Sequence, residues 1–293
     1  MSIQNILVVG SGIMGRGIAY ASAVAGFTTY LFDVSEDALA HARNEIIKIL
    51  DEGVKRGKVD SETYQETMKR LHLSSNLQEA SQQVELVIEA VPEEIAIKRS
   101  VFKQVDQFAK EDVILATNTS TMSPTEIGSF TKRPDKVIAM HFFNPVHKMK
   151  LVEIIRGLET SDETAKAVRE IAIKMKKETV MINEFPGFVT SRISSMVGNE
   201  AFYMLMEGVG TPEEIDKAIE LGLNYPMGPF KLGDLVGLDT RLKNLEYLHK
   251  TLGERFRPCP LLVKYVKAGR LGKKTGKGVY DYTESNGGKL TDV

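Results

Sequence analysis

A histidine and a glutamate, His141 and Glu153, are the side chains whose types and spacing most suggest chemistry. His141 follows the apolar run 137–140, and a histidine titrates near neutral pH, which suits general acid–base catalysis. Glu153 interrupts the apolar run 151–155, and a carboxylate among buried aliphatic side chains is costly unless it is paired. Pairing the two would remove that cost and hold the imidazole in one tautomer. From the residues alone, a structural histidine beside an unrelated carboxylate is an equally open interpretation.

A glycine pattern near the start of the chain predicts a dinucleotide site. It follows the apolar run 6–9 and leads into a helical stretch, which is the context that this pattern requires. Its first glycine allows a tight turn, its second lets the backbone approach a pyrophosphate, and its third lets the helix pack on the strand. The helix then points its positive end at the phosphates. The pattern consists of Gly10, Ser11, Gly12, Ile13, Met14 and Gly15.

Asp33 follows the next apolar run, 28–32. A carboxylate at this point accepts hydrogen bonds from both ribose hydroxyls and repels a 2′-phosphate, so the sequence favours NAD over NADP. Further polar residues follow later strand-like runs, at 117–120 and 141–145, and both segments should border the cofactor crevice. The segment 89–98 could add a carboxylate and an ammonium there, with an exposed helix start as the alternative.

Seven short β-branched runs alternate with amphipathic helical stretches over the first part of the chain. This alternation predicts an α/β fold of the Rossmann-like, doubly wound kind, with a mostly parallel sheet. The runs are 6–9, 28–32, 84–88, 113–116, 137–140, 151–155 and 180–182. About 50 residues separate the second run from the third, which leaves room for two helices, 36–51 and 61–71. They form a helical-hairpin insertion with a basic tip at 53–58. From the residues alone, the alternative is that this tip is an ordinary solvated turn without a role in binding.

The strand-like runs end before Pro186-Gly187, where we expect the domain junction. Residues 1–185 are predicted to form the NAD-binding domain, and residues 186–293 a smaller all-α C-terminal domain that forms the substrate cleft and the dimer contact. Apolar residues recur at helical spacing in this second part, and prolines divide it into several helices. A basic, glycine-containing segment at 272–280 lacks the spacing of a phosphate loop, but it could return to the cofactor.

Composition excludes several classes of protein. The formal net charge is −1, so no overall field would draw the chain to nucleic acid or to an anionic membrane. Cys259 is the single cysteine, which suits a cytoplasmic location, and no Cys/His spacing suggests a metal. The chain reaches its first strand without a leader, and no apolar run approaches the roughly 20 residues of a membrane helix. We therefore expect neither secretion nor a membrane.

Together these motifs resemble the L-3-hydroxyacyl-CoA dehydrogenase family, most closely its bacterial 3-hydroxybutyryl-CoA dehydrogenases. The resemblance covers nearly the whole chain and strengthens the pairing of His141 with Glu153. It rests on residues 10–19, 87–90, 118–120, 141–145 with 150–153, 186–188, 225–229 with 233–234, and 272–282.

The resemblance implies roles for individual residues. His141 would take the C3 hydroxyl proton of a 3-hydroxyacyl-CoA while hydride passes to NAD, Glu153 would orient and support its imidazolium form, and Ser120 would hydrogen-bond the C3 oxygen and approach the nicotinamide. Positions near NAD would be Glu93, Lys98, Asn144 and Lys274, and the hairpin tip that meets the CoA phosphates would carry Lys55 and Arg56. Family members are usually homodimers through the helical domain, so the same is expected here.

The chain departs from the family at Ser191, where an asparagine usually precedes the arginine after Pro-Gly-Phe. An amide reaches farther than a hydroxyl and offers two donors, so we expect altered turnover or chain-length preference. Two other functions stay open from the sequence. One is a dehydrogenase of a free hydroxy acid or sugar acid on the same scaffold, and the other is an NAD-binding protein without catalysis.

Overall fold

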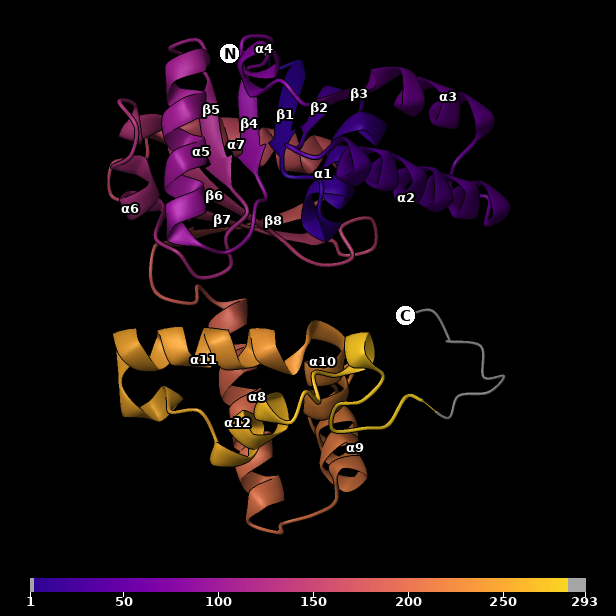
Figure 1. Cartoon of the computed structure of the whole chain (residues 1–293), viewed down its shortest axis with the longest axis vertical. Coiled ribbons are helices and arrows are strands. Elements are labelled where there is room, and N and C mark those ends of the chain that lie inside the picture. Colours follow the sequence, from indigo (N-terminus) through magenta and orange to yellow (C-terminus); the bar gives the residue numbers. More distant parts are fainter. Residues whose placement is uncertain (1–2, 284–293) are drawn as a thin grey trace. The chain divides into compact units, whose positions relative to one another are not determined.

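The computed structural model describes residues 3–283, and the chain divides into two compact units, Met1–Phe185 and Pro186–Val293 (Figure 1). The first unit is built on one sheet of strands in the order β3-β2-β1-β4-β5-β6-β7-β8. All neighbouring strands are parallel except β6 and β7. The strands are β1 (Asn5–Val9), β2 (Thr28–Phe32), β3 (Leu71–Ser74), β4 (Leu86–Glu89), β5 (Ile114–Thr117), β6 (Val137–Phe142), β7 (Leu151–Arg156) and β8 (Glu178–Asn183).

Helices cover both faces of this sheet, as the alternating pattern predicted. On one face, α1 (Ile13–Val24), α2 (Glu36–Lys55) and α7 (Asp162–Lys174) bury Ile18, Ile46 and Val168 against the strands. On the other face, α4 (Leu77–Ser81), α5 (Ile95–Phe108) and α6 (Pro124–Gly128) bury residues such as Phe102 and Ile127. A short 3-10 turn, Pro134–Lys136, leads into β6. The doubly wound fold is therefore confirmed.

The predicted helical hairpin is present as α2 and α3 (Ser61–Arg70), and a short strand that we did not predict follows it. The side chains of Ser35 and Asp60 cap the two helices by accepting hydrogen bonds from Ala38 N and Thr63 N. β3 then extends the sheet beside β2. Its side chains are half-buried or exposed, so it lacks the apolar run that revealed the central strands.

The second unit is helical in the part that the structure describes, with no named strand between residues 186 and 283. Its core packs aromatic and aliphatic side chains, including Phe202, Phe230 and Leu245. The prolines that we expected to separate helices do so by occupying their first turns, where a missing N–H costs nothing. The helices are α8 (Thr190–Met206), α9 (Pro212–Gly222), α10 (Pro229–Val236), α11 (Leu238–Leu252) and α12 (Pro260–Lys267), with 3-10 turns at Glu254–Phe256 and Lys273–Thr275.

Two buried carboxylates tie the end of the described chain to this helical unit. Asp234 accepts hydrogen bonds from the backbone N–H groups of Val279 and Tyr280, at 2.9 Å each, and from the Tyr282 hydroxyl at 3.0 Å. Asp216 accepts from the Tyr280 hydroxyl at 2.8 Å and from two N–H groups at the start of α10. Each carboxylate is thus compensated by several donors, which is what a buried charge requires.

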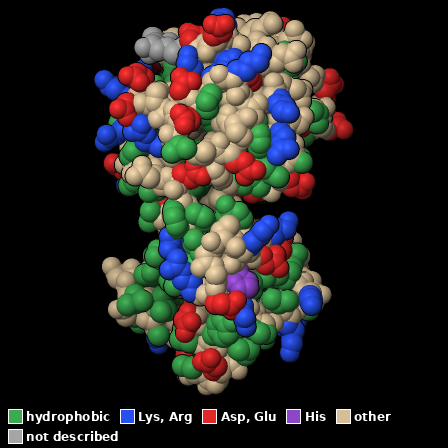
Figure 2. All heavy atoms as spheres, turned by 90° about the vertical axis from the view of Figure 1, so that its left-hand side faces the viewer, with side chains coloured by type: hydrophobic (Ala, Val, Ile, Leu, Met, Phe, Trp, Pro, Cys, Tyr) green, Lys and Arg blue, Asp and Glu red, His purple; other side chains and the backbone are tan. Residues whose placement is uncertain are grey.

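Charged side chains of both signs are interspersed over the face drawn in Figure 2, in keeping with the net charge of −1. Of the helices within residues 3–283, none combines the length and the apolar composition that crossing a membrane requires.

Candidate active site

The glycine-rich loop joins β1 to α1. At two of its three glycines, the neighbouring backbone leaves no room for a side chain. Gly10 has φ +100°, and a Cβ there would lie 2.8 Å from the carbonyl oxygen of Ala90. A Cβ on Gly15 would lie 1.7 Å from the carbonyl oxygen of Gly10, so the helix packs on the loop only without a side chain.

Protein packing does not explain Gly12, which caps the N-terminus of α1. A Cβ at Gly12 would meet nothing within 4 Å. No side chain caps this helix end, so its first N–H groups can bind an anion, and Ile13 and Met14 begin the first turn. The loop therefore fits a pyrophosphate that approaches the backbone at Gly12.

Ser11 and Asp33 connect this loop to the end of β2. The Ser11 N–H and hydroxyl donate to Asp33 Oδ2 at 2.8 and 2.7 Å, and the Ser35 N–H donates to Oδ1 at 3.1 Å. Burial alone would raise the pKa of Asp33, but the hydrogen bonds from Ser11 and from neighbouring backbone groups outweigh it and lower the pKa. The carboxylate is therefore ionised at neutral pH and would repel a 2′-phosphate.

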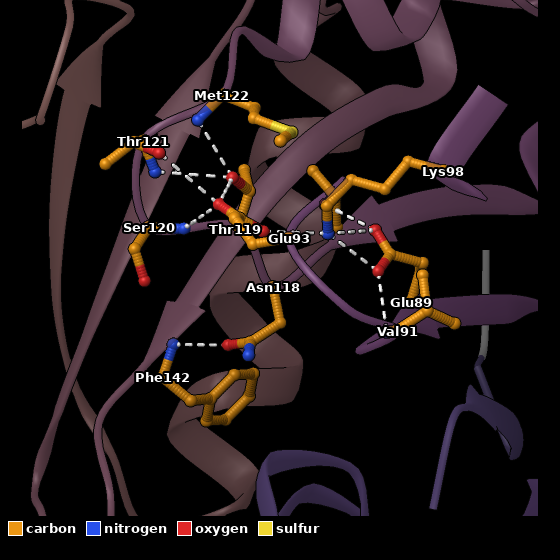
Figure 3. Close-up of polar contacts among 11 residues, drawn as sticks. Glu89, Val91, Glu93, Lys98, Asn118, Thr119, Ser120, Thr121, Met122 and Phe142 are labelled. Carbon is orange, nitrogen blue, oxygen red and sulfur yellow. Dashed lines mark hydrogen bonds and ion pairs between the residues drawn. The ribbon is translucent and has the colours of Figure 1, made fainter. Parts of the chain in front are cut away.

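A buried ammonium lies between two carboxylates at the carboxyl end of β4 (Figure 3). Lys98 Nζ lies 2.8 and 3.0 Å from the two oxygens of Glu89 and 3.1 Å from Glu93 Oε2. Burial alone would lower the pKa of Lys98, but the two glutamates outweigh burial and raise it. Lys98 is 1% exposed, so it holds Glu93 in place and presents little surface of its own to a ligand.

Sequence analysis did not identify Glu89 as the buried partner of Lys98. The signal was available, because Glu89 is the one charged residue of the strand Leu86–Glu89, just as Glu153 interrupts its own apolar strand. Thr117, at the end of β5, also donates its hydroxyl to Glu89 Oε2 at 2.7 Å. The network therefore fixes the ends of two neighbouring strands.

Ser120 and its neighbours follow β5 and are held by Glu93. The Ser120 N–H donates to Glu93 Oε1 at 3.0 Å, and the Thr119 hydroxyl donates to the same oxygen. Figure 3 shows the Ser120 hydroxyl pointing away from this network. On the other side, Asn118 Oδ1 accepts from the N–H of Phe142 at 2.9 Å, which ties this loop to β6. The backbone of Ser120 is thus held in place, while its hydroxyl can turn toward a ligand.

His141 and Glu153 are brought together by the antiparallel pairing of β6 with β7, which places them directly opposite each other. His141 Nδ1 lies 2.7 Å from Glu153 Oε2, and the two residues are 5% and 0% exposed. The carboxylate favours the tautomer with a proton on Nδ1, in which Nε2 is the ring nitrogen that carries the lone pair. The Phe143 ring packs against the imidazole at a centroid distance of 4.5 Å, and Asn144 follows in the exposed loop after β6.

The remaining predicted site residues belong to the hairpin of the first unit and to the second unit. Lys55 ends α2 and Arg56 caps it, both exposed at the hairpin tip, and Arg56 lies 3.9 Å from Glu52. Within the second unit, Ser191 lies in the first turn of α8, and its hydroxyl makes no hydrogen bond to residues 3–283.

Lys274 is also in the second unit, where its Nζ lies 2.6 and 2.8 Å from the carboxylate oxygens of Asp239. Burial alone would raise the pKa of Asp239, but the hydrogen bond from Lys274 is the main contribution that lowers it. The ammonium of Lys274 thus has an internal carboxylate partner that sequence analysis did not identify.

The doubly wound sheet, the glycine loop with Asp33 and the buried His–Glu pair define an NAD-dependent dehydrogenase with a separate helical unit. Two family models match the chain: the 3-hydroxyacyl-CoA dehydrogenase NAD-binding domain over residues 5–185 and the 3-hydroxyacyl-CoA dehydrogenase C-terminal domain over residues 187–282. The chain belongs to the 3-hydroxyacyl-CoA dehydrogenase family, as the resemblance of its motifs indicated, and its activity is NAD-dependent oxidation of 3-hydroxyacyl-CoA.

Known relatives cover almost the full chain. A probable 3-hydroxybutyryl-CoA dehydrogenase of Bacillus subtilis is 48% identical over 97% of this chain and 99% of its own. The 3-hydroxybutyryl-CoA dehydrogenase of Clostridioides difficile is 44% identical over 96% of this chain and all of its own (100%). The crystal structure of the (S)-3-hydroxybutyryl-CoA dehydrogenase of Ralstonia eutropha has a TM-score of 0.93 and 40% identity, over 97% of this chain and 100% of that one.

Proposed function

We propose that this enzyme interconverts (S)-3-hydroxybutyryl-CoA and acetoacetyl-CoA, with His141 as the general base in the direction of oxidation. The observation that carries the proposal is the 2.7 Å pair between His141 Nδ1 and Glu153 Oε2, buried beside the strand ends that carry the cofactor residues. The short acyl chain is supported by the names of the relatives described above.

In this mechanism, His141 Nε2 accepts the proton of the substrate's C3 hydroxyl. Glu153 keeps the Nδ1 proton in place and stabilises the imidazolium as it forms, which lowers the barrier because this interaction is stronger in the transition state. Ser120 donates its hydroxyl to the C3 oxygen. In the reverse direction the imidazolium of His141 returns the proton to that oxygen.

NAD, when bound, supplies the hydride acceptor. We propose that residues 10–15 hold its pyrophosphate at the start of α1 and that Asp33 accepts from the adenosine ribose. Glu93, which Lys98 holds in position, and Asn144 would lie near the nicotinamide end, as would Ser120. Lys274 is proposed to act near NAD as well, and its pairing with Asp239 would keep its ammonium in one position.

The substrate's CoA portion is assigned to the hairpin tip, where the basic side chains of Lys55 and Arg56 are exposed. Ser191 is proposed to face the C3 oxygen from the start of α8. Its hydroxyl is shorter than the amide usual at this position, so Ser120 would carry most of the hydrogen bonding to that oxygen.

We further propose a cytoplasmic homodimer that forms through the helical unit, residues 186–293. Ten large hydrophobic residues in the described part of this unit, residues 186–283, are exposed, which supports a surface covered by a second copy. They are Val189, Ile193, Met196, Met206, Val209, Leu221, Leu223, Tyr225, Leu235 and Val236. Sedimentation equilibrium would test this proposal, and a monomer at micromolar concentration would exclude it.

NADH oxidation with acetoacetyl-CoA tests the proposed activity directly. We expect turnover with this thioester and far less with free acetoacetate or a sugar acid. His141→Ala should lose about a hundredfold to ten-thousandfold in kcat, with NADH affinity little changed, because His141 acts on the proton and not on the dinucleotide. Normal NADH binding without turnover of acetoacetyl-CoA would leave a non-catalytic NAD-binding protein as the better interpretation.

A further inference from the structure

Another buried ammonium of the first unit, that of Lys177, has no part in the proposed chemistry. Lys177 lies between α7 and β8 and is 9% exposed. Its Nζ donates to the backbone carbonyl oxygens of Val146 and Met149, the latter at 2.8 Å. Lys98 lies between two carboxylates, whereas no carboxylate of residues 3–283 lies within ion-pair distance of Lys177. Burial therefore lowers the pKa of Lys177 without an offsetting charge, so this position is costly for a lysine.

The two carbonyl groups belong to the loop 143–150, which joins the strand of His141 to the strand of Glu153. Within this loop, the carbonyl of Pro145 accepts hydrogen bonds of 3.0 Å from the N–H groups three and four residues later, which closes a tight turn. Val146 is the one buried residue of the loop. Since few of its side chains are buried, the loop depends on a small number of anchors.

One anchor of the loop is apolar and lies on α1. A Cβ on Gly17 would lie 2.9 Å from Val146 Cγ2, so Gly17 leaves the space that the valine side chain occupies. The ring of His147 then lies edge-on to the ring of Tyr20, with a centroid distance of 6.1 Å. The other anchor is polar, and it consists of the two hydrogen bonds from Lys177.

The end of α7 places Lys177 beside the loop. The N–H groups of Lys176 and Lys177 donate to carbonyl groups in the last turn of α7, at 2.9 and 3.0 Å, in the pattern of a Schellman motif. Lys176 has φ +58°, a conformation that usually belongs to glycine at this point of the motif. The next residue, Glu178, begins β8 and donates its N–H to the carbonyl of Lys150 at 2.8 Å. The backbone on both sides of Lys177 is thus fixed.

We propose that Lys177 is a positioning residue for the reaction, which holds the loop 143–150 so that Phe143 stays against His141 and Asn144 stays beside the nicotinamide. The inference rests on the proposed function, in which His141 is the base and Asn144 lies near the nicotinamide. Phe143 packs on the imidazole at a centroid distance of 4.5 Å. Both residues directly precede the anchored turn, so release of the turn would displace them. All of these residues belong to the first unit.

Lys177→Met tests the proposal, because it keeps an unbranched side chain and removes the donors. We expect kcat in NADH oxidation with acetoacetyl-CoA to fall about tenfold to a hundredfold, since a misplacement of about 1 Å can cost about a hundredfold. NADH affinity should be little changed, because the glycine loop and Asp33 are untouched. A merely structural role would lower stability and leave the kcat of the folded enzyme at its wild-type value.

Two further variants separate positioning from a general effect of the substitution. Lys177→Arg restores cationic N–H donors and should recover part of the lost kcat. Lys176→Met is the matched control, because it removes an exposed ammonium from the adjacent position and should leave kcat unchanged.

The position of the loop can also be measured without activity. The chain has no tryptophan, so Met149→Trp introduces a single fluorophore into the loop. Acrylamide should quench this tryptophan more strongly when Lys177→Met is added, because the turn is then released from one of its two anchors.

A folded Lys177→Met enzyme with wild-type kcat would overturn the proposal, as would unchanged quenching or a Lys177→Arg kcat no higher than that of Lys177→Met. Failure of the wild type to turn over acetoacetyl-CoA would instead overturn the proposed function. If Lys177→Met does not fold, Lys177→Gln takes its place, because its amide keeps N–H donors but is shorter and uncharged. It should lower kcat and increase quenching, and wild-type values of both would overturn the proposal.

Discussion

Glu153→Gln removes the negative charge that faces His141 and retains nearly the same shape. In the wild type the carboxylate accepts the Nδ1 proton across 2.7 Å, and both groups are buried. An amide at this position lacks the charge, and its NH₂ group can face Nδ1 as a donor, which favours the other tautomer. Nε2 would then carry the proton and could not act as the base.

The structure sets the size of the expected effect. A hydrogen bond to a charged group contributes about 1.5–3 kcal/mol, and each 1.36 kcal/mol of barrier is about tenfold in rate. The imidazolium forms as the reaction proceeds, so most of this energy is lost in the transition state. We expect kcat to fall about tenfold to 150-fold, which is less than the loss expected for His141→Ala.

The assay is acetoacetyl-CoA-dependent NADH oxidation, with NADH affinity measured separately by fluorescence. NADH affinity should stay within about twofold of wild type, because Glu153 contacts His141 and lies on β7, away from the glycine loop. Glu178→Gln is the matched control, since Glu178 is an exposed carboxylate on the neighbouring strand β8 and should leave kcat unchanged. A Glu153→Gln enzyme that is folded and retains wild-type kcat would refute the role assigned to the pair.

Three further predictions concern the cofactor and CoA sites. Gly12→Ala should leave the free energy of unfolding nearly unchanged and weaken NADH binding, whereas Gly15→Ala should destabilise the fold, because a Cβ there meets the Gly10 carbonyl; urea unfolding and NADH titration distinguish the two. Asp33→Ala should raise kcat/KM for NADPH relative to NADH, and unaltered selectivity would contradict the ribose contact. Arg56→Glu should raise KM for acetoacetyl-CoA and have little effect on a truncated acetoacetyl thioester, and equal effects on both would place CoA elsewhere.

Much of this protein could be predicted from local pattern. Strands that are buried on both faces of a sheet consist of consecutive apolar residues. The central sheet and the alternation of strands and helices could therefore be predicted from the spacing of apolar residues. A charged residue within such an apolar run stands out, because a buried glutamate must have a partner. His141 and Glu153 were identified in this way, and the glycine loop through its place between a strand and a helix.

The strand at the edge of the sheet and the hydrogen-bond partners of Asp234 could not be predicted from local pattern. β3 is half-exposed, so it carries no apolar run, and its place beside β2 depends on pairing between distant segments. The partners of Asp234 come from the last described residues. Such contacts depend on how distant parts of the chain pack together, which local spacing does not encode.

The sequence by itself determined the residues that we propose for the chemistry: His141, Glu153 and the glycine loop through their types and their places at the end of a strand or within one, and Ser120 through the family resemblance. Only the tertiary structure decided how these side chains face one another. The antiparallel register of β6 and β7 places His141 opposite Glu153, and a shift of one residue would turn the two side chains to opposite faces of the sheet. Only the structure also showed that Arg241 is buried, because burial is a property of the packed helices and not of one segment.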